Sequence, residues 1–119
     1  MLYILNSAVL PLKEGQQYVI TARQVSIQEV RDMLQKEHYT SAIGHEATAK
    51  LLSNVLGVDI PLNRIQVQLQ PKDRMLAFLL KKRLPEGVVL KTVEELEQIG
   101  YSFWMFYIYD YDDPNPCIR

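Results

Sequence analysis

The chain has 119 residues, of which 48% are hydrophobic and 23% are charged. These values predict one globular domain with a single core. The 13 Lys and Arg residues nearly balance the 14 Asp and Glu residues, which gives a formal net charge of −1. Proteins that bind long DNA or RNA through its phosphates usually carry a basic excess, so this charge argues against a duplex nucleic acid partner.

The cysteine content and the hydropathy pattern predict the cellular setting. Cys117 is the only cysteine, which excludes an intrachain disulfide and favours a reducing compartment. No signal peptide is recognisable, and no apolar run approaches the roughly 20 residues that cross a membrane. We therefore expect a soluble, cytoplasmic protein without a membrane partner.

The N-terminal half of the chain predicts two strands and a helix. Leu2–Leu5 and Tyr18–Thr21 are short apolar runs, typical of buried strands, on either side of a turn at Gly15. Ser26-Ile-Gln-Glu29 is a capping-box sequence, which predicts a helix that ends near Glu37. One face of this helix is apolar and carries Ile27, Val30, Met33 and Leu34.

A second helix is predicted from Gly44 to Gly57, and His45 stands at its start. Its apolar stripe would anchor the helix in the core and consists of Ala47, Leu51, Leu52, Val55 and Leu56. The first turn of a helix offers unpaired N–H groups and a partial positive charge, which favour phosphate binding. Gly44 would let the chain turn sharply or approach a ligand closely. This helix start is therefore the first candidate for a site.

The C-terminal half predicts a half-solvated strand, a central strand, a short helix and an aromatic strand. Arg64–Gln70 alternates polar and apolar residues, as in a strand with one solvated face. Met75–Leu80 is continuously apolar, as in a central strand covered on both faces. Thr92–Glu95 forms a second capping box and opens a helix that stops at Gly100. The aromatic run Tyr101–Tyr109 predicts the last strand.

Together these elements predict an α/β fold, a single compact domain in which helices flank a mixed β-sheet. We place this domain in residues 1–109 and an acidic, proline-containing tail in residues 110–119. In open α/β sheets, strand ends and a helix start commonly meet at one edge, where ligands bind. The basic run Lys81–Arg83 begins where the apolar strand ends, and the strand ends and the start of a helix can converge at such an edge.

The residues by themselves leave other interpretations open. His45 could simply cap or pack the helix, Lys81–Arg83 could be a solvated strand end, and Arg64 could pair with a surface carboxylate. The aromatic strand could be core, a subunit contact or a platform on which bases stack. Composition and periodicity therefore do not decide the function.

Three short motifs carry a more specific resemblance. Ala42-Ile-Gly-His45 with Thr48-Ala49, then Asn63-Arg64, then Arg83-Leu-Pro-Glu-Gly87 resemble the motifs of a family of small α/β proteins, in their order and separations. The resemblance extends from Leu2 through the aromatic strand. Members of this family occur in archaeal viruses, prophages and some bacteria, and they act as ring nucleases, including anti-CRISPR ones. They degrade cyclic tetra-adenylate, the second messenger of type III CRISPR systems.

The resemblance implies a cleavage that needs neither metal nor cofactor. The ribose 2′-OH attacks the adjacent phosphorus and leaves a 2′,3′-cyclic phosphate, so the protein must align these groups, stabilise charge and supply a proton. His45 is the implied general acid, Arg83 would hold the phosphoryl oxygens, and Glu86 would orient the 2′-OH or Arg83. The implied ligand contacts are Asn6, Ser7, Ile43, Gly44 and Arg64. In the sequence itself, no cluster of Cys, His and carboxylates has the spacing of a metal site.

The resemblance also implies a homodimer, because a two-fold axis offers a cyclic tetranucleotide two copies of each contact. Two other functions compete with this hypothesis: a non-catalytic sponge for the cyclic nucleotide, and a dimeric module that binds a protein through its aromatic strand. A DNA binder is the third alternative, which the acidic pI of 6.1 disfavours. For a viral member, the expected location is the cytoplasm of the host cell.

Overall fold

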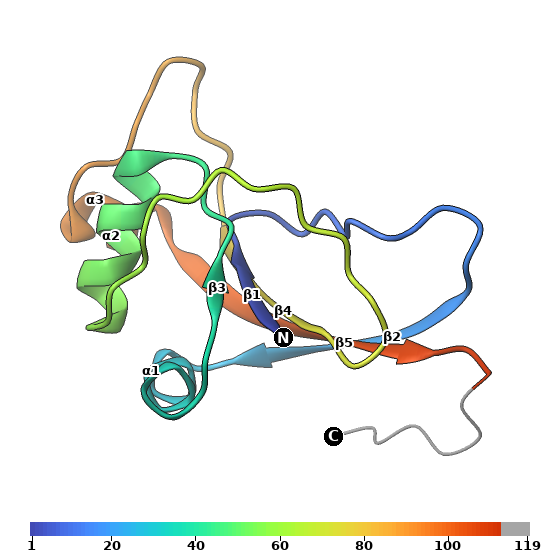
Figure 1. Cartoon of the computed structure of the whole chain (residues 1–119). Helices are drawn as coiled ribbons and strands as arrows, with labels where there is room; N and C mark the ends of the chain where they lie inside the picture. Colours follow the sequence, from blue (N-terminus) through green and yellow to red (C-terminus); the bar gives the residue numbers. More distant parts are fainter. Residues whose placement is uncertain (113–119) are drawn as a thin grey trace.

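The computed structural model describes residues 1–112, and in this range three helices pack with one five-stranded mixed sheet (Figure 1). The strand order in the sheet is β2-β5-β4-β1-β3. The strands are β1 (Leu2–Leu5), β2 (Tyr18–Val25), β3 (Thr40–Ser41), β4 (Arg74–Leu80) and β5 (Tyr101–Asp110), and the helices are α1 (Ile27–Lys36), α2 (Glu46–Leu56) and α3 (Val93–Ile99). The predicted α/β fold with a mixed sheet is confirmed. Cys117 and the rest of residues 113–119 of the predicted tail lie outside the described residues.

Three strands of the sheet are parallel, so the chain leaves them on the same side of the molecule. β1 pairs in parallel with β3, where Ile4 lies opposite Ser41, and with β4, where Leu5 lies opposite Ala77. β5 runs antiparallel to both β4 and β2. Figure 1 shows the loops after β1, β3 and β4 leaving the sheet in the same direction. We call the residues that follow these strands, 6–7, 42–45 and 81–86, the carboxyl edge.

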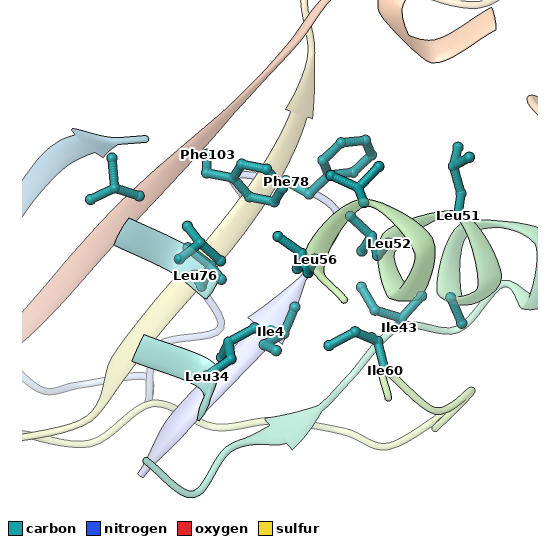
Figure 2. Close-up of a cluster of buried hydrophobic side chains, with 14 of the residues drawn as sticks. Ile4, Leu34, Ile43, Leu51, Leu52, Leu56, Ile60, Leu76, Phe78 and Phe103 are labelled. Atoms are coloured by element: carbon teal, nitrogen blue, oxygen red, sulfur yellow. The ribbon is translucent and has the colours of Figure 1, made fainter. Parts of the chain in front are cut away.

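The helices cover one face of the sheet and bury the main core there (Figure 2). Leu76 and Phe78 of β4, Phe103 of β5, Leu34 of α1 and Leu56 of α2 belong to this cluster, and each is at most 5% exposed. Burying a side chain of this size stabilises the fold by about 1.5–3 kcal/mol relative to leaving it in water. The core therefore holds α2, and with it the start of that helix, firmly against the sheet.

The alternating segment Arg64–Gln70 covers the other face of the sheet but is not a strand. Leu69 is fully buried and Val67 packs beside it, in a cluster that includes Met75 of β4. The segment makes only one isolated β-bridge, between Leu69 and Leu12. The strand prediction is therefore wrong, because the apolar side chains of this segment pack onto the face of the sheet while its backbone does not join a ladder.

The two predicted capping boxes have different outcomes. In α1, Ser26 Oγ accepts a hydrogen bond from Glu29 N–H at 3.1 Å, and the Glu29 carboxylate accepts one from Ser26 N–H at 3.2 Å, so this box is confirmed. In α3, Thr92 Oγ1 accepts from Glu95 N–H at 3.1 Å. The Glu95 carboxylate, however, accepts from the Thr92 hydroxyl at 3.2 Å. The second box is only half formed, because the Glu95 carboxylate bonds the Thr92 hydroxyl instead of the Thr92 backbone N–H.

Several element boundaries also differ from the prediction. α2 begins at Glu46 rather than at Gly44, and β2 continues to Val25. β5 includes Asp110, the first residue of the predicted tail. The sequence does not predict β3, because a strand of two residues has no periodicity to detect. Met75–Leu80 does form the central strand β4, between β5 and β1, as predicted.

Candidate functional site

The carboxyl edge brings the predicted site residues to one side of the molecule. Asn6 and Ser7 follow β1, Gly44 and His45 follow β3, and Arg83 lies in the loop after β4. Their side chains are exposed except that of Ser7, which is half-buried, while Gly44 has none. The expected convergence of strand ends and a helix start is thus confirmed, and it follows from the parallel pairing of the three strands.

His45 is the N-cap residue of α2, and its side chain is exposed. Its carbonyl oxygen accepts a helical hydrogen bond from Ala49 N–H at 3.0 Å, while its imidazole makes no capping hydrogen bond. The His45 side chain therefore neither caps the helix by a hydrogen bond nor lies buried in the core. The first N–H groups of α2 receive no side-chain cap from His45, the residue at which the helix begins. This arrangement suits the binding of an anion and proton transfer to it.

Arg64 lies directly beside this helix start. Its Nε donates a hydrogen bond to the Gly44 carbonyl oxygen at 2.9 Å, although the two residues are 20 positions apart. The Arg64 side chain is exposed, and the bond from Nε leaves the two Nη groups for phosphoryl oxygens. Within residues 1–112, Arg64 forms no ion pair, so the alternative of a surface salt bridge is not found.

Gly44 contributes to the site through its main chain, not through the sharp turn that a glycine at this position suggested. Its φ is not positive, unlike those of Gly57 and Gly87, and the chain forms no turn or bend at Gly44, so the first of the two predicted uses, a sharp turn, is wrong. A Cβ at Gly44 would lie 3.6 Å from Arg64 Cγ, which is an ordinary contact. The structure shows that the carbonyl oxygen of Gly44 holds the Arg64 side chain by a hydrogen bond.

Ile43 supports the site rather than lining it, which corrects the prediction of a ligand contact. Its side chain is fully buried and belongs to the main core, where Figure 2 shows it beside Leu52 and Ile60. Its N–H donates to Ser41 Oγ at 3.3 Å, and its carbonyl oxygen accepts from Asn63 N–H at 2.9 Å. Both the side chain and the main chain of Ile43 are thus engaged within the protein.

The loop after β4 carries Arg83 and Glu86, and both side chains are exposed. It contains a turn in which Val88 N–H donates to the Pro85 carbonyl oxygen at 3.1 Å, as the Leu-Pro-Glu-Gly sequence indicates. After this loop the chain returns to the start of α2. Lys91 and residues near the start of that helix line a common hollow of about 260 Å³. Within the described residues, no hydrogen bond or ion pair joins Arg83 or Glu86 to His45, although all three residues belong to the carboxyl edge.

Sequence reasoning missed two polar residues behind the site. Ser41 and Asn63 hydrogen-bond the segment that carries His45 to the segment that carries Arg64. Asn63 belongs to one of the motifs, next to Arg64, but the partner of its side chain, Ser41, lies 22 positions away in the sequence. Only the folded chain reveals that contact.

The described residues can be compared with the requirements of a metal site and of a membrane-spanning helix. In residues 1–112, no three His, Cys, Asp or Glu side chains gather closely enough to hold a metal ion. None of the helices in this range has the length and the apolar character required to cross a membrane.

The fold and the site define a small single-domain α/β protein whose polar residues gather where three parallel strands end. Residues 2–103 match the STIV B116-like family, and the chain belongs to this family. A solved structure with the same fold is that of B116 from Sulfolobus turreted icosahedral virus, with a TM-score of 0.69 and 25% sequence identity. That similarity covers 89% of this chain and 97% of B116.

Relatives of the chain come from viruses and from a bacterium. Protein 26 of Sulfolobus islandicus filamentous virus (isolate Iceland/Hveragerdi) is 56% identical over 112 residues, which cover 94% of this chain and 95% of that protein. ORF117 of Acidianus two-tailed virus is 40% identical and covers 87% of this chain and 90% of its own length. YddF of Bacillus subtilis (strain 168) is 34% identical and covers 71% of this chain and 79% of its own length. The family membership and the viral relatives agree with the part of the resemblance that placed the chain in a viral family of small α/β proteins.

Proposed function

We propose that the protein is a metal-independent ring nuclease, which opens cyclic tetra-adenylate and thereby switches off type III CRISPR signalling. The observation that carries this proposal is the exposed imidazole of His45 at the uncapped start of α2, beside a guanidinium anchored on Gly44. An anion, a proton donor and a planar cation can meet at this point. The match of residues 2–103 to a family with viral relatives is consistent with the viral family that the sequence motifs resemble.

The proposed reaction uses the substrate's own nucleophile. The 2′-oxygen of a ribose attacks the adjacent phosphorus in line, the bond from phosphorus to the 5′-oxygen breaks, and a 2′,3′-cyclic phosphate remains. His45 gives its proton to the departing 5′-oxygen, a transfer that typically accelerates a reaction about 10²–10⁴-fold. Arg83 stabilises the charge on the phosphoryl oxygens, and Glu86 orients the 2′-OH or Arg83. Arg64, Asn6 and Ser7 contact the ligand.

The proposal includes a homodimer that encloses the ligand about a two-fold axis. A ring of four nucleotides is large for the edge of one 119-residue chain. The surface around the carboxyl edge supports association, because it carries large apolar side chains that are exposed in the single chain. These are Val9 at 71%, Leu62 at 44%, Ile65 at 43%, Val88 at 46% and Val89 at 54% exposure. Burying such side chains against a second copy would be favourable.

Incubation of the purified protein with cyclic tetra-adenylate, with and without EDTA, tests the proposal. Linear products that end in a 2′,3′-cyclic phosphate and form equally fast in EDTA are the expected result. Tight binding without products would replace the nuclease with a sponge, and an absence of both binding and products would favour a protein partner. Loss of activity in EDTA would overturn the metal-independent scheme.

A further inference from the structure

Two polar side chains fix the segment that carries Gly44 and His45. Ser41 is only 3% exposed, and its hydroxyl donates to the Pro61 carbonyl oxygen at 2.7 Å and accepts from Ile43 N–H at 3.3 Å. Asn63 binds the same segment twice, because its Nδ2 donates to the Ser41 carbonyl oxygen at 2.7 Å and its backbone N–H donates to the Ile43 carbonyl oxygen at 2.9 Å. We call Ser41 and Asn63 the clasp.

The clasp joins the two segments that carry groups of the proposed site. One segment continues from Ser41 to His45, and the other continues from Asn63 to Arg64. Together with the bond from Arg64 to Gly44, these hydrogen bonds set their separation, since the second segment is not a strand and has no ladder to hold it. A buried polar group without a partner costs about 1–3 kcal/mol, so any other arrangement of the two segments is disfavoured.

We infer that Ser41 and Asn63 are positioning residues for the proposed reaction, which act through His45 and Arg64. This inference rests on the proposed function. A general acid must come within about 2.6–3.2 Å of the atom it protonates, and a misplacement of about 1 Å can cost roughly 100-fold in rate. Ser41 is buried and does not need to touch the ligand. Loss of the clasp should therefore lower the rate of the bound complex more than it lowers affinity.

Single-turnover cleavage of saturating cyclic tetra-adenylate by Ser41→Ala and Asn63→Ala tests the inference, with Ser53→Ala as the matched control. Ser53 Oγ accepts from Ile60 N–H at 2.9 Å, so it ties the same returning segment to α2 but does not reach the residues beside His45. We expect a loss of tenfold or more in both clasp variants, a smaller change in Kd, and a rate within about threefold of the parent for Ser53→Ala. Equal rates in the parent and in both clasp variants would overturn the inference.

Amide hydrogen exchange of the ligand-free protein gives a second readout that does not depend on activity. The N–H groups of Ala42 and Ile43 are both hydrogen-bonded, to the Ile4 carbonyl oxygen and to Ser41 Oγ. Asn63→Ala should accelerate their exchange tenfold or more, whereas Ser53→Ala should not. If the parent protein forms no linear product, the proposed function is refuted. The exchange rates then still show whether the clasp fixes the segment that carries His45. Unchanged exchange in Asn63→Ala would reject the clasp in either case.

Discussion

The two ends of β4 use positive charge in opposite ways. At its start, Arg74 bonds the Glu37 carboxylate through both terminal nitrogens, and the N-terminal ammonium of Met1 pairs with Asp73 at 3.3 Å. At its end, within residues 1–112, Arg83 forms no ion pair. Cations at the start of the strand hold distant parts of the chain together, while the cation at its end remains available to a ligand. If the proposed function is correct, one end of β4 serves stability and the opposite end serves binding.

The largest expected effect comes from His45, which lies at the carboxyl edge, where we propose that the ligand binds. His45→Ala should lower single-turnover cleavage of cyclic tetra-adenylate about 10²–10⁴-fold, because the departing oxygen then lacks its proton donor. The side chain is exposed and makes no capping hydrogen bond, so the melting temperature should hardly change. Cleavage at the parent's rate would remove His45 from the mechanism.

A smaller effect on binding is expected from Arg64. Arg64→Ala removes the guanidinium beside α2, and its hydrogen bond to the Gly44 carbonyl oxygen, so Kd for cyclic tetra-adenylate should rise about tenfold or more. Arg64→Lys, which keeps the charge without the planar fork, should fall between the two proteins. Calorimetric titration of both variants in the His45→Ala background measures binding without cleavage. Equal affinities in all three would exclude Arg64 as a ligand contact.

At the start of β4, Arg74→Ala removes the ion pair with Glu37. The free energy of unfolding should fall by about 1 kcal/mol, which is the usual contribution of a partly exposed bidentate pair. The Arg74 side chain is 24% exposed and that of Glu37 is 41% exposed. Denaturant unfolding of the variant and the parent gives this difference directly. A variant as stable as the parent would mean that the pair contributes nothing to the fold.

The smallest effect concerns the exposed pair of Arg23 and Glu29. The hydrogen bond from Arg23 lowers the pKa of the Glu29 carboxyl below its ordinary value. A lowered folded-state pKa adds stability above the pKa of the unfolded state, and this stability is lost as the pH falls through the folded value. Glu29→Gln should therefore melt slightly below the parent at pH 7 and together with it at strongly acid pH. Thermal melts across that range check the sign.

Local signals in the sequence were enough to predict much of the fold. The capping box at Ser26 defines the start of α1, and the unbroken apolar run of Met75–Leu80 identifies the central strand. In both cases the residues that decide the structure are neighbours in the chain. The position of His45 at a helix start could be predicted for the same reason.

The remaining features depend on contacts between distant residues. The alternation in Arg64–Gln70 shows that one face is buried, but it does not show whether the backbone pairs with a strand or only packs onto a sheet. Likewise, the bond from Arg64 to Gly44 and the clasp of Ser41 and Asn63 each span 20 residues or more. No local pattern encodes such contacts, so the architecture behind the site emerges only from the structure.

Side-by-side cleavage rates of Arg83→Ala and Arg74→Ala test most directly the assignment of catalysis to one end of β4. Arg74 is the first residue of β4, and Arg83 lies in the loop that follows this strand. Both variants are measured under single turnover with saturating cyclic tetra-adenylate, at a temperature where they are folded. We predict a loss of about 10²–10³-fold for Arg83→Ala and an unchanged rate for Arg74→Ala. Equal rates in the two variants would contradict the account.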